Sequence, residues 1–192
     1  MRVLVVAEGQ HEQSGALENL LKRLGGERAD FEVDRVSNSR IHTFHGTGPG
    51  YFKRAVRWLR EAEKRGVDAL VFLIDEDGRS ERVGQIRDAQ DSPLSALPRA
   101  LGVAIRTFDA WMLVDEKTLT DVLGYRVDRQ PDPETIRDPK VVCTALLESS
   151  PASPTQRQMY AQIADEVDLD VLCKRCPSGF APFASSVRRI FR

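Results

Sequence analysis

Short apolar runs alternate with helical periodicity over much of the chain. The uninterrupted runs "RVLVV" and "ALVFLI" are typical of buried parallel strands. "FEVDRV" alternates apolar and polar residues, which predicts a more exposed strand, and "GVAIR" predicts a fourth. Apolar residues at helical spacing predict amphipathic helices over Ala16 to Leu24 and Phe52 to Ala62, and a polar helix is expected around Ser80 to Gln90. Strands and helices therefore alternate.

This alternation predicts an α/β fold with a Rossmann-like, mostly parallel four-stranded sheet flanked by helices. From Asp109 onward the pattern becomes helical, and Asp132 followed by Pro133 is a typical helix start. We expect residues 1–192 to form a single domain, with an α/β core over 1–125 and a helical C-terminal extension over 126–192 packed on it.

Composition restricts the class of protein. The 192 residues are 41% hydrophobic and 30% charged, which is typical of a folded globular chain. The net charge of −1 indicates no general affinity for polyanions, so a nucleic-acid site would have to be a local patch. No apolar run has the length of a signal-peptide core or a membrane span, and we expect a cytoplasmic protein without a membrane partner.

The three cysteines do not indicate a disulfide framework or a metal site. Their number is odd, and Cys143 is far in sequence from Cys173 and Cys176. "CKRC" has the spacing of half a zinc site, but the chain contains no second pair. We interpret Cys173 and Cys176 as two thiols at the end of a helix.

Carboxylates follow three of the four predicted strands. Glu8 follows the first, Asp75 and Asp77 follow the third, and Asp109 lies beyond the fourth. The carboxyl ends of parallel strands meet at one edge, so these acids should converge and repel each other unless a cation compensates them. Mg²⁺ or Mn²⁺ prefers such oxygen ligands, and two ions could clamp a phosphodiester. Taken singly, the Asp75–Gly78 stretch is more typical of a turn, and Asp109 of a helix cap; it is the combination of acids after three strands that favours a metal site.

Other residues could assist such a site. Gly9 and Glu12 follow Glu8, and a Gly-rich loop carries His42 and His45, with Lys53 shortly after it. Backbone N–H groups and cations of this kind can bind phosphate, although a plain surface loop or a His-x-x-His zinc pair are alternatives. Arg106 and Lys140 are further cationic candidates that could stabilise charge on a phosphoryl group.

"VLVVAEGQHE" and "LVFLIDEDG" resemble the Toprim fold of topoisomerases, primases, overcoming-lysogenization-defect nucleases and ribosomal RNA maturases. The resemblance implies a Toprim-like version of the Rossmann-like fold. It also implies a catalytic Mg²⁺ (or Mn²⁺) held by a Glu after the first strand and an Asp-x-Asp after the third. Those positions are Glu8, Asp75 and Asp77.

The chain more closely resembles the Toprim-like family called domain of unknown function 4276. "EGQHE", "IDEDG", "IRTFDAWMLVD", "IRDPK", "MYAQIA" and "CPSGFAPF" carry this resemblance over nearly the whole chain. The family usually has Glu where this chain has Asp109, so the shorter side chain could ligate a metal directly or through water. The resemblance implies Mg²⁺-dependent nuclease or phosphoryl-transfer activity on nucleic-acid phosphodiesters.

Other functions remain open from the sequence. The same core could bind metal or nucleotide without catalysis, as a regulatory subunit beside an ATPase partner. "FLIDEDG" also resembles the Asp-x-Asp-Gly-Thr box of haloacid-dehalogenase-like phosphatases, but Arg79 replaces the Thr and the box follows the third strand instead of the first. A response-regulator receiver would begin with paired acids where this chain has Ala7 and Glu8.

Overall fold

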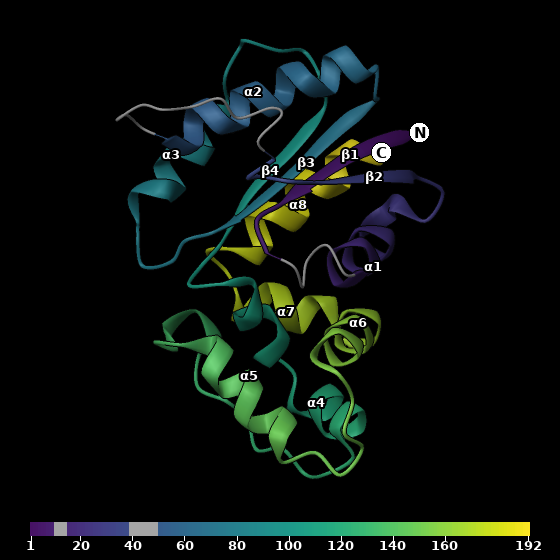
Figure 1. Cartoon of the computed structure of the whole chain (residues 1–192), viewed down its shortest axis with the longest axis vertical. Helices are drawn as coiled ribbons and strands as arrows, with labels where there is room; N and C mark the ends of the chain where they lie inside the picture. The colour runs from purple at the N-terminus through teal and green to yellow at the C-terminus, as the bar shows by residue number, and fades with distance from the viewer. Residues whose placement is uncertain (10–14, 39–49) are drawn as a thin grey trace.

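The sheet confirms the predicted α/β architecture. The computed structural model describes residues 1–9, 15–38 and 50–192. Four strands, β1 (Arg2–Ala7), β2 (Asp30–Arg35), β3 (Ala69–Asp75) and β4 (Arg99–Ala104), pair in the order β2-β1-β3-β4, and all pairs are parallel (Figure 1). The apolar strands β1 and β3 lie in the centre, and the alternating β2 lies at an edge, as their patterns predict.

Helices cover both faces of the sheet (Figure 1). α2 (Gly50–Arg65) and α3 (Glu81–Gln90) pack on the face formed by alternate strand residues such as Leu70 and Phe72. The opposite face, which includes Val71, is covered by α1 (Leu17–Leu21), its π-helical continuation η2 (Lys22–Gly26) and α8 (Phe180–Ile190). Both faces are therefore apolar, which explains the uninterrupted runs of the central strands.

The remaining helices form a lobe beyond one end of the sheet (Figure 1). It contains the short 3-10 helices η3 (Phe108–Leu113) and η4 (Pro133–Thr135), and α4 (Glu116–Leu123), α5 (Pro139–Glu148), α6 (Gln156–Glu166) and α7 (Leu169–Arg175). α6 packs on α1, where Asn19 Nδ2 donates a hydrogen bond to the carbonyl of Ala161 at 3.1 Å. In space, α8 leaves this lobe and returns to the sheet.

The predicted helix start at Asp132 is only partly confirmed. The Asp132 carboxylate accepts from the Glu134 N–H at 3.3 Å, but the helix ends after the single 3-10 turn of η4. Asp138 and Pro139 repeat the same signal and begin the longer α5. Glu134 is then free to accept hydrogen bonds from the N–H groups of Ser178 and Gly179, which positions the chain before α8.

The three cysteines are free thiols, as expected. Cys173 lies in α7 and Cys176 directly follows it. Burial raises the pKa of Cys143 to about 12 and also raises the pKa of Cys176, so neither thiol forms a thiolate near neutral pH. Of the helices in the described ranges, none has both the length and the apolar character that crossing a membrane requires.

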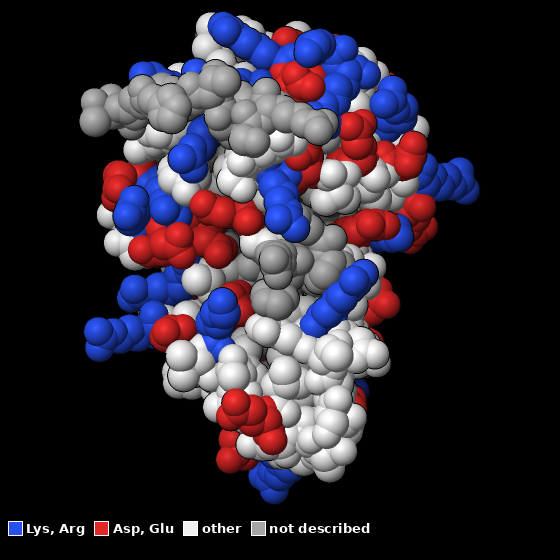
Figure 2. Space-filling model, in the orientation of Figure 1, with Lys and Arg blue, Asp and Glu red and all other residues white. Residues whose placement is uncertain are grey.

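Charge is distributed without a large patch of one sign on the visible face. Figure 2 shows basic and acidic side chains interspersed around the sheet and its helices, while much of the helical lobe is uncharged on this side. A polyanion would therefore need a local cluster of cations, as the net charge of −1 already suggests.

Candidate functional site

Glu8 and Asp75 meet at the carboxyl ends of β1 and β3. The register pairs Ala7 with Leu73, so the two strands end side by side. One Glu8 oxygen, Oε2, accepts a hydrogen bond from the Asp75 N–H at 3.2 Å. Both residues are half-buried. The parallel sheet thus brings together the two acids that the sequence places after its central strands.

Arg82 of α3 lies among these acids. Its side chain is only 8% exposed, and Nη1 donates to the Asp75 carbonyl at 2.5 Å and to Asp77 Oδ2 at 2.8 Å. The same nitrogen lies 3.8 Å from Glu8 Oε2. Burial lowers the pKa of Arg82, but Asp77 and Glu8 outweigh this effect and raise it overall. A protein cation therefore already compensates much of the negative charge here.

Tyr51, in the first turn of α2, completes the surroundings of Glu8. Its hydroxyl donates to Glu8 Oε1 at 2.6 Å, and its ring lies 4.4 Å from the Arg82 guanidinium carbon. Partial burial and the Glu8 carboxylate together raise the pKa of Tyr51 to about 12. Glu8 is thus held by a phenol on one oxygen and a backbone N–H on the other.

This contact gives a first prediction. Glu8→Gln should lower the pKa of Tyr51 from about 12 toward its ordinary value of 10, because phenolate formation would no longer be opposed by a neighbouring negative charge. Ultraviolet absorbance titration of the wild type and Glu8→Gln, each against its Tyr51→Phe derivative, isolates this phenol. An unchanged pKa would show that the hydroxyl does not contact Glu8 in solution.

Asp75 and Asp77 have different environments. Asp75 Oδ1 accepts from the N–H of Phe108 at 2.8 Å, which ties β3 to the start of η3. Asp77 has a left-handed backbone with φ 51°, and its N–H donates to the carbonyl of Arg106, whose φ is 64°. Two adjoining residues other than glycine in this conformation indicate backbone strain, which is frequent at functional sites.

Glu76, between the two aspartates, is engaged with the protein. Its Oε2 atom accepts from the N–H of Arg106 at 3.2 Å, and the residue is half-buried. The turn after β3 is thereby linked to the turn after β4. The three consecutive carboxylates of "DEDG" therefore have different partners: Asp75 and Glu76 bind the backbone after β4, and Asp77 binds Arg82 of α3.

The structure gives Asp109 other neighbours. The residue is 8% exposed, and its carboxylate accepts a hydrogen bond from the Tyr160 hydroxyl of α6. Burial, together with Cys143 and Asp109, raises the pKa of Tyr160, so this phenol stays protonated as a donor. Cys143 of α5 lies against the Asp109 carbonyl. Asp109 thus joins η3 to α5 and α6 within the helical lobe instead of meeting the carboxylates of Glu8 and Asp75.

A cavity with three cations in its lining lies beside Asp77. It has a volume of about 400 Å³, and Arg106, Arg137 and Lys140 line it together with Asp77 and the start of α5. The structure therefore brings together the two cations that the sequence suggested, Arg106 and Lys140, and adds Arg137. Asp77 and Asp138 also line the cavity, but the three cations outnumber these two acids and can bind a phosphate group.

None of the hydrogen bonds and ion pairs described above involves the remaining candidates that the structure describes, Gly9 and Lys53. Gly9 is half-buried next to Glu8, and Lys53 is exposed on α2. Glu12, His42 and His45 lie outside the described residues. Arg82 and Tyr51 were missed from the sequence. Arg82 could have been found because it lies four and seven residues before Ile86 and Ala89, on the apolar stripe of α3 where an arginine needs a partner.

Glu8, Asp75 and Asp77 have carboxylate oxygens, the type of ligand that Mg²⁺ and Mn²⁺ prefer. Over residues 1–9, 15–38 and 50–192, no three Asp, Glu, His or Cys side chains are grouped closely enough to hold an ion together. Mg²⁺, however, is commonly bound by one or two carboxylates, with waters and substrate phosphates as its other ligands. Glu8 and Asp75 fit that arrangement, and Asp77 would first have to leave Arg82.

Comparisons with known proteins do not assign the chain to a family. No family model matches the chain, and no curated protein or solved structure matches it either.

Proposed function

We propose that the protein is a Mg²⁺- or Mn²⁺-dependent phosphoryl-transfer enzyme of the Toprim type that acts on nucleic-acid phosphodiesters. The observation that supports this most is the pairing of Glu8 with Asp75 at the strand ends, together with a cavity at the following turn that Asp77, Arg106, Arg137 and Lys140 line. Acids alone would repel a phosphodiester, and cations alone would only bind it. Their adjacency supports both binding and reaction.

Each part of the site has a physical role in this proposal. Arg137 and Lys140 are exposed at the cavity and would contact phosphate oxygens, which orients the phosphodiester. The Phe108 N–H and Tyr51 hydroxyl fix the orientation of Asp75 and Glu8. Glu8 and Asp75 would hold the metal ion, which when bound supplies Lewis-acid polarisation of a phosphoryl oxygen.

Cleavage assays with ligand variants test the proposal. We expect supercoiled DNA, single-stranded DNA or RNA to be cleaved with Mg²⁺ or Mn²⁺. Glu8→Gln and Asp75→Asn should reduce cleavage at least about a hundredfold, because losing a ligand should exceed the effect of losing its outer partners. Asp128→Asn and Glu148→Gln, which alter exposed acids elsewhere, are matched controls. Equal cleavage by parent and both site variants would place the activity elsewhere.

A second candidate function is nucleotide or metal binding without catalysis, in a regulatory subunit beside an ATPase partner. It is favoured by the position of Arg82, whose guanidinium lies between Glu8 and Asp77. The charge of these carboxylates is therefore already compensated without a catalytic metal ion. In this case, calorimetry should detect binding of a mononucleotide to the wild type and weaker binding to Arg137→Gln and Lys140→Gln. No nucleic acid should be cleaved. Lys117→Gln, an exposed lysine on α4, is the control.

A further inference from the structure

The outer edge of β4 is incompletely covered. β4 is the last strand of the sheet, and its backbone groups alternate between β3 and the outer side. The side-chain amide of Gln90 covers the first part, accepting from the Leu101 N–H at 2.8 Å and donating to the Arg99 carbonyl at 3.3 Å. The Leu101 carbonyl and the Val103 N–H come next on this side.

Beyond these two groups the edge is closed again by the chain before α8. A Cβ atom placed on Gly179 would lie 3.0 Å from the Ile105 nitrogen and 3.1 Å from the Val103 oxygen, so this backbone lies directly against the end of β4. The open part of the edge is therefore short. A carbonyl and an N–H two residues apart are the pair that one residue of a parallel neighbouring strand binds.

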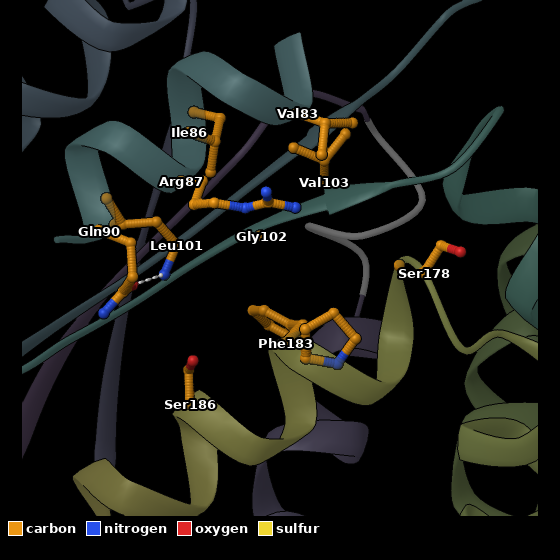
Figure 3. A pocket seen from close by; sticks show the side chains of 12 residues that line it. Val83, Ile86, Arg87, Gln90, Leu101, Gly102, Val103, Ser178, Phe183 and Ser186 are labelled. Atoms are coloured by element: carbon orange, nitrogen blue, oxygen red, sulfur yellow. Dashed lines mark hydrogen bonds between the residues drawn. The ribbon is translucent and has the colours of Figure 1, made fainter. Parts of the chain in front are cut away.

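A small apolar cavity opens at this same place. It has a volume of about 130 Å³ and lies between α3 and α8, beside the backbone of Gly102 (Figure 3). Phe183 and Pro182 of α8 line one side of it, and Val83 and Ile86 of α3 line the other. An apolar cavity of about 150 Å³ holds a benzene-sized group. This cavity therefore has the size for one aliphatic or aromatic side chain.

The cavity carries one uncompensated charge. Arg87 is the only charged residue among those that line it, and its side chain extends along the α3 side of the opening (Figure 3). Arg87 is exposed, and in the described part of the chain no acidic side chain forms an ion pair with it. The opening is thus complementary to a ligand that is apolar on the α8 side and negatively charged on the α3 side.

We propose that this opening is a docking site for an extended acidic segment of a partner protein, which adds to β4 as a short parallel strand. The residue opposite Gly102 binds the Leu101 carbonyl and the Val103 N–H, and places an apolar side chain against Phe183. Neighbouring residues of a strand point to opposite faces, so the next residue points toward α3 and places its carboxylate on Arg87. Backbone pairing supplies affinity, and the cavity with Arg87 supplies specificity.

Labelled peptides test the proposal without reference to catalysis. The probe is a short extended fluorescein-labelled peptide with a central Leu-Glu step. We expect saturable binding by fluorescence anisotropy, about fivefold weaker binding of the Leu-Gln peptide, and the same loss for the Leu-Glu peptide with Arg87→Gln. Arg126→Gln, which removes an exposed arginine that does not line the cavity, should leave the affinity unchanged. Arg87→Glu should reverse the preference, so that a Leu-Lys peptide binds better.

Two further measurements separate edge pairing from loose contact. A peptide with an N-methyl group at the Leu should lose binding, and hydrogen exchange should show protection of the Val103 amide only with the unmethylated peptide. Binding that is equal for all peptides, or no binding at millimolar concentration, would overturn the proposal. Concentration-dependent dimerisation with protection of Val103 in the absence of peptide would assign the edge to a second copy of the chain, and would overturn it too.

Discussion

Replacing Arg82 with Met should destabilise the metal-free protein by about 2 kcal/mol. The substitution preserves much of the side-chain volume but leaves Glu8 and Asp77 without their shared cation and the Asp75 carbonyl without its donor. The loss should stay below the roughly 3–5 kcal/mol typical of a fully buried pair, because the Glu8 and Asp77 side chains are 28% and 48% exposed. Urea unfolding monitored by circular dichroism measures this change.

The same variant should respond more strongly to a divalent ion. With the guanidinium removed, Mn²⁺ no longer competes with a protein cation, and we expect a larger rise in melting temperature at millimolar Mn²⁺ than in the wild type. Arg79→Met alters an exposed arginine in the preceding turn and should change neither property. If Arg82→Met bound Mn²⁺ more weakly than the wild type, Arg82 would support the ion instead of competing with it.

Replacing Trp111 with Ala should have a still larger effect on stability, about 4 kcal/mol. Trp111 of η3 is fully buried and contacts three aromatic rings, with centroid distances of 5.3 Å to Phe108, 5.0 Å to Phe180 and 5.7 Å to Phe183. It joins the helical lobe to α8, so the cavity left by Ala would lie where the two parts of the protein meet. Chemical denaturation gives the free energy of unfolding.

Trp111→Phe is the matched control for this prediction. We expect a loss of only about 1–2 kcal/mol, because one ring is retained and the indole N–H that is removed has no hydrogen-bond partner within the described residues. Equal effects of Ala and Phe would contradict the proposed role of ring packing. A loss below 1 kcal/mol for Ala would indicate that the surrounding rings close the cavity.

Much of the sheet could be predicted from the sequence because its strands are buried in different ways. "RVLVV" and "ALVFLI" have no polar interruption and became the central strands, whereas "FEVDRV" alternates and became an edge. The helix start predicted at Asp132 leads only to the single turn of η4. Local signals such as an Asp-Pro pair favour a helix start, but they do not set how far the helix continues, and here the Glu134 side chain binds the backbone before α8.

The candidate site could be predicted only in outline. The positions of Glu8 and Asp75 follow from parallel strands that end together, so strand assignment was sufficient to bring them close. The contact of Arg82 with Asp77 depends on the rotation of α3 over the sheet, and that of Asp109 with Tyr160 on how α6 packs against η3. Such long-range packing is not encoded in any local spacing.

The position of α8 has a consequence for how the protein is made. Together with α1, this helix covers one face of the sheet, yet it follows all four strands by more than seventy residues. During synthesis the strands will have left the ribosome while that apolar face is still partly uncovered. The nascent chain should therefore bind chaperones that recognise exposed apolar surface until residues 180–190 emerge, and a stalled chain ending before Phe180 should remain sensitive to protease.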